Sequence, residues 1–158
     1  MSSNTRLWDK GQPLDERILR YTAGEDHILD ARLIQYDVRA SIAHAGMLHA
    51  QGLISEADYA AIETGLSTLA ESHAAGEWCI SLEDEDVHTA LESRLTDAIG
   101  DAGKRIHLGR SRNDQVLVAL RLYLRDAAQQ LATAAQTTVT ALEELADKQG
   151  QVALPGYT

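Results

Sequence analysis

The sequence lacks several residue types that constrain a fold. Its 158 residues include a single cysteine, Cys79, which excludes an internal disulfide framework and a zinc site built from cysteines. There is no phenylalanine, and the two prolines, Pro13 and Pro155, lie near the two ends, so nothing between them forbids long helices. The core must therefore be built from leucine, isoleucine, valine and alanine, a composition that suits packed helices.

Positive charge and long apolar runs are also scarce. The chain has 14 Lys and Arg against 24 Asp and Glu, a net charge of −10. It therefore lacks the basic surface of a general nucleic-acid binder and is not attracted to anionic membranes. No apolar run approaches the roughly 20 residues of a spanning helix, and residues 1–12 lack the apolar centre of a signal peptide. We therefore expect a cytoplasmic protein with no nucleic-acid or membrane partner.

Apolar residues spaced three and four positions apart predict an all-α protein. Three helices are expected at 30–50, 55–76 and 81–100, each followed or ended by a glycine. Ser55 and Ser81, each followed three positions later by an aspartate, are expected to cap the second and third of them. The expected buried stripes are Leu33, Tyr36, Ala40, Ala43 and Met47, then Tyr59, Ile62, Leu66 and Leu69, then Val87, Leu91, Leu95 and Ile99.

A fourth, much longer helix is predicted from Asn113 to about Lys148, where neither glycine nor proline occurs. Its apolar positions, from Leu117 to Leu145, alternate in threes and fours over about five heptads. At 1.5 Å per residue this helix is about 50 Å long, which suits a helical bundle shared between subunits. We therefore expect a small helical N-terminal domain at 1–112, followed at 113–158 by the start of a long bundle domain.

The segment 100–113, GDAGKRIHLGRSRN, concentrates positive charge in an acidic protein. It holds Lys104, Arg105, Arg110 and Arg112, and its glycines allow the backbone to approach a ligand closely. The long helix begins directly after it, and the free N–H groups and positive dipole end of a helix favour an anion. The segment predicts a carboxylate or phosphate site. A solvated loop whose cations pair with acidic neighbours is an equally good interpretation of these residues alone.

Several motifs occur in order along the chain: LWDKG near the start, YDVRASIAHAGML at 36–48, DEDVHTALESRL at 84–95, GRSRNDQV at 109–116 and VALPGYT at 152–158. In these motifs the chain resembles the argininosuccinate lyases of the fumarase/aspartase superfamily over essentially its whole length. The resemblance implies a fumarase/aspartase-like all-α fold in which the long helix is the first of a central bundle. It further implies a homotetramer whose sites combine segments of different subunits, and no metal or organic cofactor.

The resemblance also implies a reaction and the residues that serve it. Argininosuccinate lyases cleave L-argininosuccinate reversibly into L-arginine and fumarate by β-elimination, a step of arginine biosynthesis. Arg112 would bind a succinyl carboxylate through both arms of its guanidinium group. Asn113 and Ser111 would hydrogen-bond the substrate, and Thr158 would bind its succinyl part. His88 has two interpretations: a surface histidine with an acidic residue four positions away on either side, or, by the resemblance, an auxiliary residue that orients the substrate.

The chain also departs from the family's pattern, and two alternatives accompany the resemblance. The family's general acid-base histidine follows the threonine of PGYT, and its mobile serine loop lies further on, so we expect the chain by itself to be inactive. Residues 9–12 read DKGQ where the family has Gly-Gly-Arg-Phe, which puts the substrate contacts of the N-terminal arm in doubt. The alternatives are another fumarate-releasing lyase of the superfamily, against which GRSRNDQ weighs, and a non-catalytic, crystallin-like scaffold.

Overall fold

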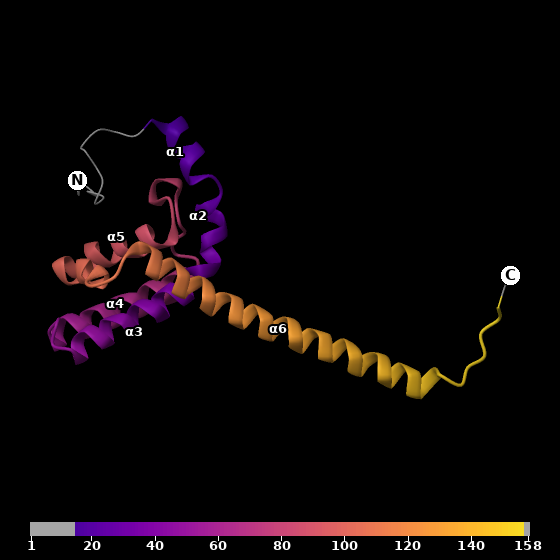
Figure 1. Ribbon diagram of the computed structural model, residues 1–158. Coiled ribbons are helices and arrows are strands. Elements are labelled where there is room, and N and C mark those ends of the chain that lie inside the picture. The colour runs from indigo at the N-terminus through magenta and orange to yellow at the C-terminus, as the bar shows by residue number, and fades with distance from the viewer. Residues whose placement is uncertain (1–14, 157–158) are drawn as a thin grey trace. The chain divides into compact units, whose positions relative to one another are not determined.

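The computed structural model describes residues 15–156 (Figure 1). Thr158, the LWDKG motif and residues 9–12 lie outside the described residues. Within the described part the chain is helical and contains no strand, which confirms the predicted all-α class. The chain divides into two compact units, Met1–Arg121 and Leu122–Thr158, which we describe separately.

The first unit contains most of the helices. In chain order its elements are α1 (Glu16–Ala23), α2 (Asp26–Leu29), the 3₁₀ turn η1 (Asp30–Leu33), α3 (Ile34–Ala50), α4 (Glu56–Ala74), the 3₁₀ turn η2 (Leu82–Asp84), α5 (Val87–Ile99), the 3₁₀ helix η3 (Gly100–His107) and the beginning of α6 (Arg112–Gln149). Helix α4 packs against both α3 and α5, and η3 folds back onto α5. These contacts place the segment before α6 directly beside α5.

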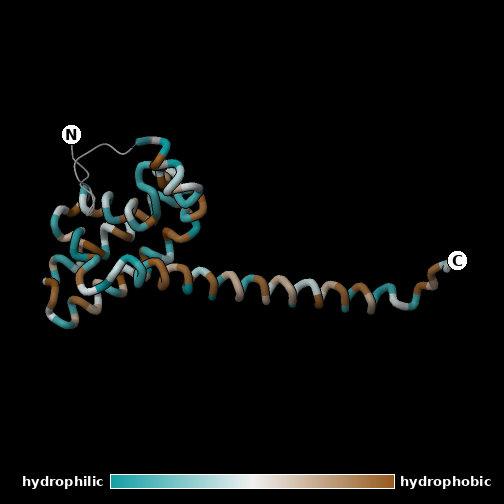
Figure 2. Tube along the Cα trace, turned by 45° about the horizontal axis from the view of Figure 1, so that its top comes forward, coloured by the Kyte–Doolittle hydropathy of each residue, from teal (hydrophilic) through white to brown (hydrophobic). Residues whose placement is uncertain are grey.

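The core of this unit is aliphatic, as the composition predicts, and the apolar positions recur along the helices in Figure 2. The expected stripes of the second and third helices are confirmed, because their central leucines, isoleucine and valine are all buried. The stripe expected on α3 is partly wrong. Ala43 and Met47 are exposed, and the buried face runs instead through Ile34, Val38, Ala45 and Leu48. Two polar residues on that face, described below, interrupt its apolar pattern in the sequence.

Helix starts follow local capping. Ser55 accepts a hydrogen bond from the Asp58 N–H (3.1 Å) and caps α4 as predicted. Ser81 instead caps the short turn η2 and not α5. The turn ends at Glu85, whose φ of 67° is a left-handed conformation, so Ser81 is separated from α5. Helix α5 begins after Asp86, which is its N-cap: the Asp86 carboxylate accepts a hydrogen bond from the Thr89 N–H (2.7 Å). The short helices α1, α2 and η3 were not predicted, since segments of this length show little periodicity.

The long helix is confirmed as α6, Arg112–Gln149. Its first turns belong to the first unit, where Gln115 and Ala119 are fully buried, and its remainder forms the second unit. The predicted domain boundary near Arg112 stays a prediction. Within residues 15–156, every helix is too short or too polar to span a lipid bilayer.

Candidate active site

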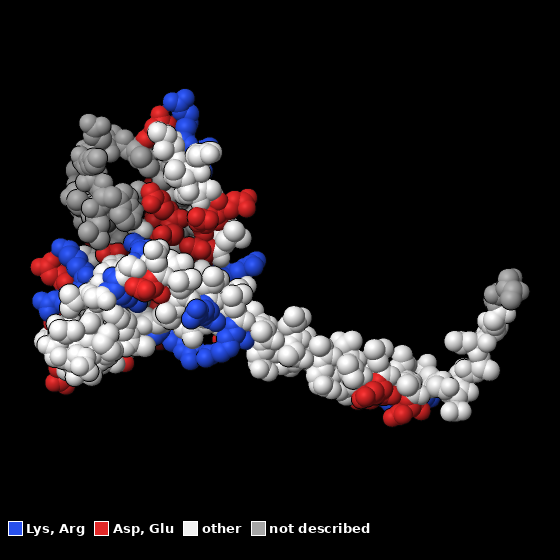
Figure 3. Space-filling view, viewed as in Figure 1, with Lys and Arg blue, Asp and Glu red and all other residues white. Residues whose placement is uncertain are grey.

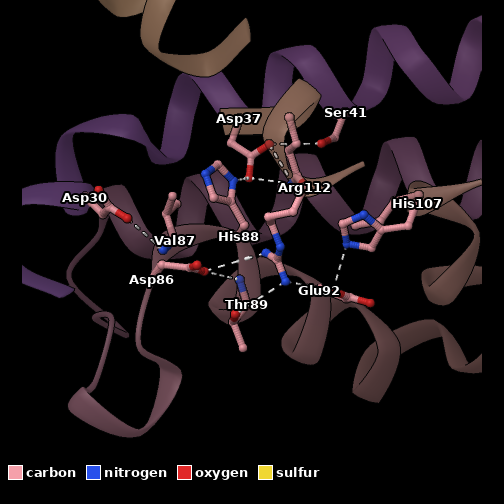
Figure 4. Close-up of polar contacts among 12 residues, drawn as sticks. Asp30, Asp37, Ser41, Asp86, Val87, His88, Thr89, Glu92, His107 and Arg112 are labelled. Carbon is pink, nitrogen blue, oxygen red and sulfur yellow. Dashed lines mark hydrogen bonds and ion pairs between the residues drawn. The ribbon is translucent and has the colours of Figure 1, made fainter. Parts of the chain in front are cut away.

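The candidate site lies in the first unit, where the start of α6 meets α3 and α5 (Figure 4). Helix α6 begins with a reciprocal cap: the Ser111 N–H and hydroxyl both donate to the Asp114 carboxylate (2.9 and 3.1 Å), and the Asp114 N–H donates back to the hydroxyl (3.4 Å). Of the two predicted donors here, Ser111 therefore uses its hydroxyl in the cap, and Asn113 is exposed beside it.

The guanidinium group of Arg112 lies among side chains from α5 and the loop before it. Its Nη2 is 3.4 Å from both Glu92 Oε2 and Thr89 Oγ1, and its Nη1 is 3.6 Å from Asp86 Oδ1. These distances exceed those of ordinary charge-assisted hydrogen bonds. Nη1 is buried and forms no hydrogen bond within the described part of the chain. Arg112 is thus held loosely between two carboxylates. A carboxylate ligand could compete with them for its guanidinium group.

The other cations of the 100–113 segment are engaged elsewhere. Lys104 pairs with Asp101 (2.8 Å), and Arg105 pairs with Asp58 of α4. Arg110 donates to a main-chain carbonyl of η3 and to a serine hydroxyl of α3. Pairing with acidic neighbours, the alternative interpretation of this segment, therefore describes Lys104 and Arg105. The candidate anion site narrows to Arg112 and the start of α6.

His88 is buried, with 2% of its side chain exposed, so its interpretation as a surface residue is wrong. Its Nδ1 lies 2.8 Å from Oδ2 of Asp37 on α3 and forms no ion pair with Asp84 of η2 or Glu92 of α5, the acidic residues four positions away on either side. Of those two, Asp84 pairs with Arg94, and Glu92 pairs with a histidine of η3. The fold turns His88 inward because the start of α5 packs against α3.

Asp37 is the centre of a buried polar cluster that the sequence analysis did not predict. Its carboxylate accepts hydrogen bonds from the Gln115 amide, 2.9 Å from each oxygen, and from the Ser41 hydroxyl (3.1 Å), besides its contact with His88. Burial by itself would raise the pKa of Asp37, but its hydrogen bond and electrostatic interaction with His88 and its hydrogen bonds with Gln115 and Ser41 lower that pKa below the ordinary value. The carboxyl is therefore ionised at neutral pH.

A second carboxylate, Glu92, connects η3 with α6. His107 Nε2 lies 2.8 Å from its Oε2, the same oxygen that faces Arg112. Burial opposes ionisation of Glu92, yet the hydrogen bond and charge of His107, with the charge of Arg112, lower its pKa. Glu92 is thus an anion shared by His107 and Arg112, of which His107 is the closer.

Comparison with known proteins shows the family. The family model described as Lyase matches residues 13–158, nearly the whole chain. The chain belongs to the lyase family. It is 49% identical over 98% of its length to an argininosuccinate lyase of Sorangium cellulosum, covering 36% of that protein. It is also 40% identical over 97% of its length to one of Thermotoga neapolitana, covering 38%, and 46% identical over 93% to one of Thiobacillus denitrificans, covering 31%.

These matches confirm the resemblance that the motifs indicated. This lyase-family chain spans about a third of the length of the curated relatives it matches. The structure brings three predicted site residues, Ser111, Arg112 and Asn113, together at the start of α6, and places His88 close by, next to Thr89, which Arg112 contacts.

Proposed function

We propose that this chain is the N-terminal part of an argininosuccinate lyase, which cleaves L-argininosuccinate reversibly into L-arginine and fumarate. The observation that carries the proposal is the 40–49% identity, over nearly the whole chain, with proteins of that name from three organisms. The arrangement at the start of α6 supports it, because argininosuccinate carries three carboxylates and Arg112 is a loosely paired forked cation.

The chemistry explains why such a cation is useful. A base removes a proton from the carbon beside a succinyl carboxylate, the electron pair forms the carbon–carbon double bond, and the bond to the guanidino nitrogen breaks as that nitrogen is protonated. Negative charge grows on the carboxylate before the bond breaks, and a preorganised donor that strengthens with this charge lowers the barrier. In our proposal Arg112 binds this carboxylate, Asn113 and Ser111 hydrogen-bond the substrate, Thr158 binds its succinyl part, and His88 orients it.

The complete protein is a homo-oligomer in this proposal, a tetramer by the family resemblance, with α6 as a bundle helix. Residues 127–142 of α6 include no charged side chain. Leu131 is 72% exposed and Leu142 60% exposed on the single chain. Figure 3 shows the same stretch as an uncharged surface that ends in acidic side chains. An uncharged helix with exposed leucines is typical of an interface with other helices. Light scattering of the purified protein measures the mass directly.

The activity is tested on the complete polypeptide that carries this sequence, by following fumarate release through its ultraviolet absorbance. We expect turnover of argininosuccinate and none of adenylosuccinate. The opposite preference would replace the proposal by another fumarate-releasing lyase. A folded protein that cleaves neither substrate would support the non-catalytic scaffold instead.

A further inference from the structure

The pair formed by Asp37 and His88 is unusual in being almost completely buried, with 0% and 2% of the side chains exposed. Burying two such groups costs desolvation free energy, and well-packed apolar residues often stabilise a protein as well or better. Stability alone therefore gives a weak reason for this pair. His88 lies on α5 next to Thr89, which contacts Arg112, and this position suggests that the pair has a role in the site itself.

The protonation of the pair follows from the carboxylate. Because Asp37 is ionised, it can only accept hydrogen bonds, so Nδ1 of His88 must carry a proton. The imidazole is thereby fixed with Nδ1 toward α3, and only Nε2 can meet a ligand. Gln115 must likewise turn its NH₂ group toward Asp37, which it does at 2.9 Å from both oxygens.

Three consecutive residues at the start of α5 are held by three different elements. The Val87 N–H donates to Asp30 of η1 (3.2 Å), His88 contacts Asp37 of α3, and the Thr89 hydroxyl faces Arg112 of α6. Figure 4 shows these contacts converging on one short stretch of α5. The ring of His88 is thus held by its own Nδ1 contact and by the contacts of the residues before and after it, Val87 and Thr89.

We propose that Asp37 is a positioning residue for the lyase reaction: it orients His88 toward the substrate, and Gln115 locks this pair to the start of α6, where Arg112 and Asn113 lie. This inference rests on the proposed function. Side chains from α3, α5 and α6 then move as one body, so that the histidine and the carboxylate-binding arginine keep a fixed separation. Small errors in such a separation lower the rate of the chemical step far more than they weaken binding.

The test is steady-state kinetics of Asp37→Asn in the complete polypeptide, with argininosuccinate as substrate. Asparagine keeps the size of aspartate but replaces one acceptor oxygen with an NH₂ group, which can only donate. We expect kcat to fall roughly 10- to 100-fold, as for a misoriented catalytic geometry, with KM little changed. The matched control is Asp84→Asn, a buried carboxylate that pairs with Arg94 and takes no part in the Asp37 cluster, and it should keep wild-type kcat.

A double-variant comparison separates positioning from a merely structural role. If Asp37 acts through His88, then Asp37→Asn combined with His88→Gln should lose no more activity than His88→Gln alone. Additive losses would overturn the inference, as would a wild-type kcat in a folded Asp37→Asn protein. If Asp37→Asn fails to fold, the same kinetics are measured for Gln115→Met, which removes the hydrogen-bond donor to Asp37 but keeps the side-chain volume. A wild-type kcat in Gln115→Met would also overturn the inference. An inactive wild-type protein would instead refute the proposed function, and this inference with it.

Discussion

Replacing Arg112 with lysine tests whether the candidate site needs a forked cation or only a positive charge. In the structure Nη1 faces Asp86 at 3.6 Å while Nη2 faces Glu92 and Thr89 at 3.4 Å, and a single ammonium group cannot occupy both positions. A donor that acts on the growing charge of the substrate carboxylate is worth about 2–4 kcal/mol in the transition state. Because about 1.36 kcal/mol corresponds to tenfold in rate, kcat/KM should fall about 30- to 900-fold.

The assay is fumarate release by the complete polypeptide, measured over a range of argininosuccinate concentrations. If Arg112 tightens its grip as the carboxylate gains charge, kcat falls together with kcat/KM, whereas a loss confined to KM would indicate equal binding of ground and transition states. Arg121→Lys, an exposed position on the same helix, is the matched control and should leave both constants unchanged. Wild-type constants in Arg112→Lys would reduce Arg112 to a surface cation at a helix start and refute the reasoning.

Two further predictions concern stability and are measured by thermal or urea unfolding of the complete polypeptide. Gly103→Ala should destabilise the protein by about 1–3 kcal/mol, because its new Cβ would lie 2.8 Å from the Thr96 Cα, whereas Gly46→Ala, with no contact closer than 3.6 Å, should be neutral or stabilising. Burial opposes ionisation of Asp84, but its hydrogen bonds with Arg94 and Ser81 and the charge of Arg94 lower its pKa in the folded protein. The ionised Asp84 therefore contributes fully to the free energy of unfolding above pH 3.8, the ordinary value of its pKa. This contribution disappears as the pH falls through the lower pKa of the folded state. The stability difference between wild type and Asp84→Asn should therefore shrink in that acidic range; a constant difference would contradict the assignment.

The helices that the sequence predicts well are those in which periodicity and capping agree. The long helix α6 is uninterrupted by glycine or proline, and α4 has both a regular apolar stripe and the Ser55 cap. On α3 the stripe was misassigned because Asp37 and Ser41 occupy two positions of the buried face. Their spacing of four, on an otherwise apolar face, was the available signal that a polar cluster is buried there.

The site could be predicted only as far as local sequence reaches. The basic segment before α6 and the position of Arg112 at a helix start are visible in the sequence. The partners are not: Asp37 and Gln115 lie 78 residues apart, and Arg105 and Asp58 lie 47 apart. No periodic pattern links such positions, so neither the buried cluster nor the neutralisation of Arg105 follows from the chain's local features.

If Arg112 binds a substrate carboxylate, as we propose, the sharing of Glu92 with His107 lowers the cost of that exchange. Releasing a buried carboxylate from its only partner would leave an uncompensated charge and cost several kcal/mol, roughly 3–5. Glu92, however, lies 2.8 Å from His107 and only 3.4 Å from Arg112, so its stronger bond persists when Arg112 turns to a ligand. Arg112 itself exchanges long contacts for the shorter, two-armed bonds that a free carboxylate allows. In the proposed function, the acidic side chains around Arg112 therefore hold its guanidinium group in place, and exchanging them for a substrate carboxylate costs little.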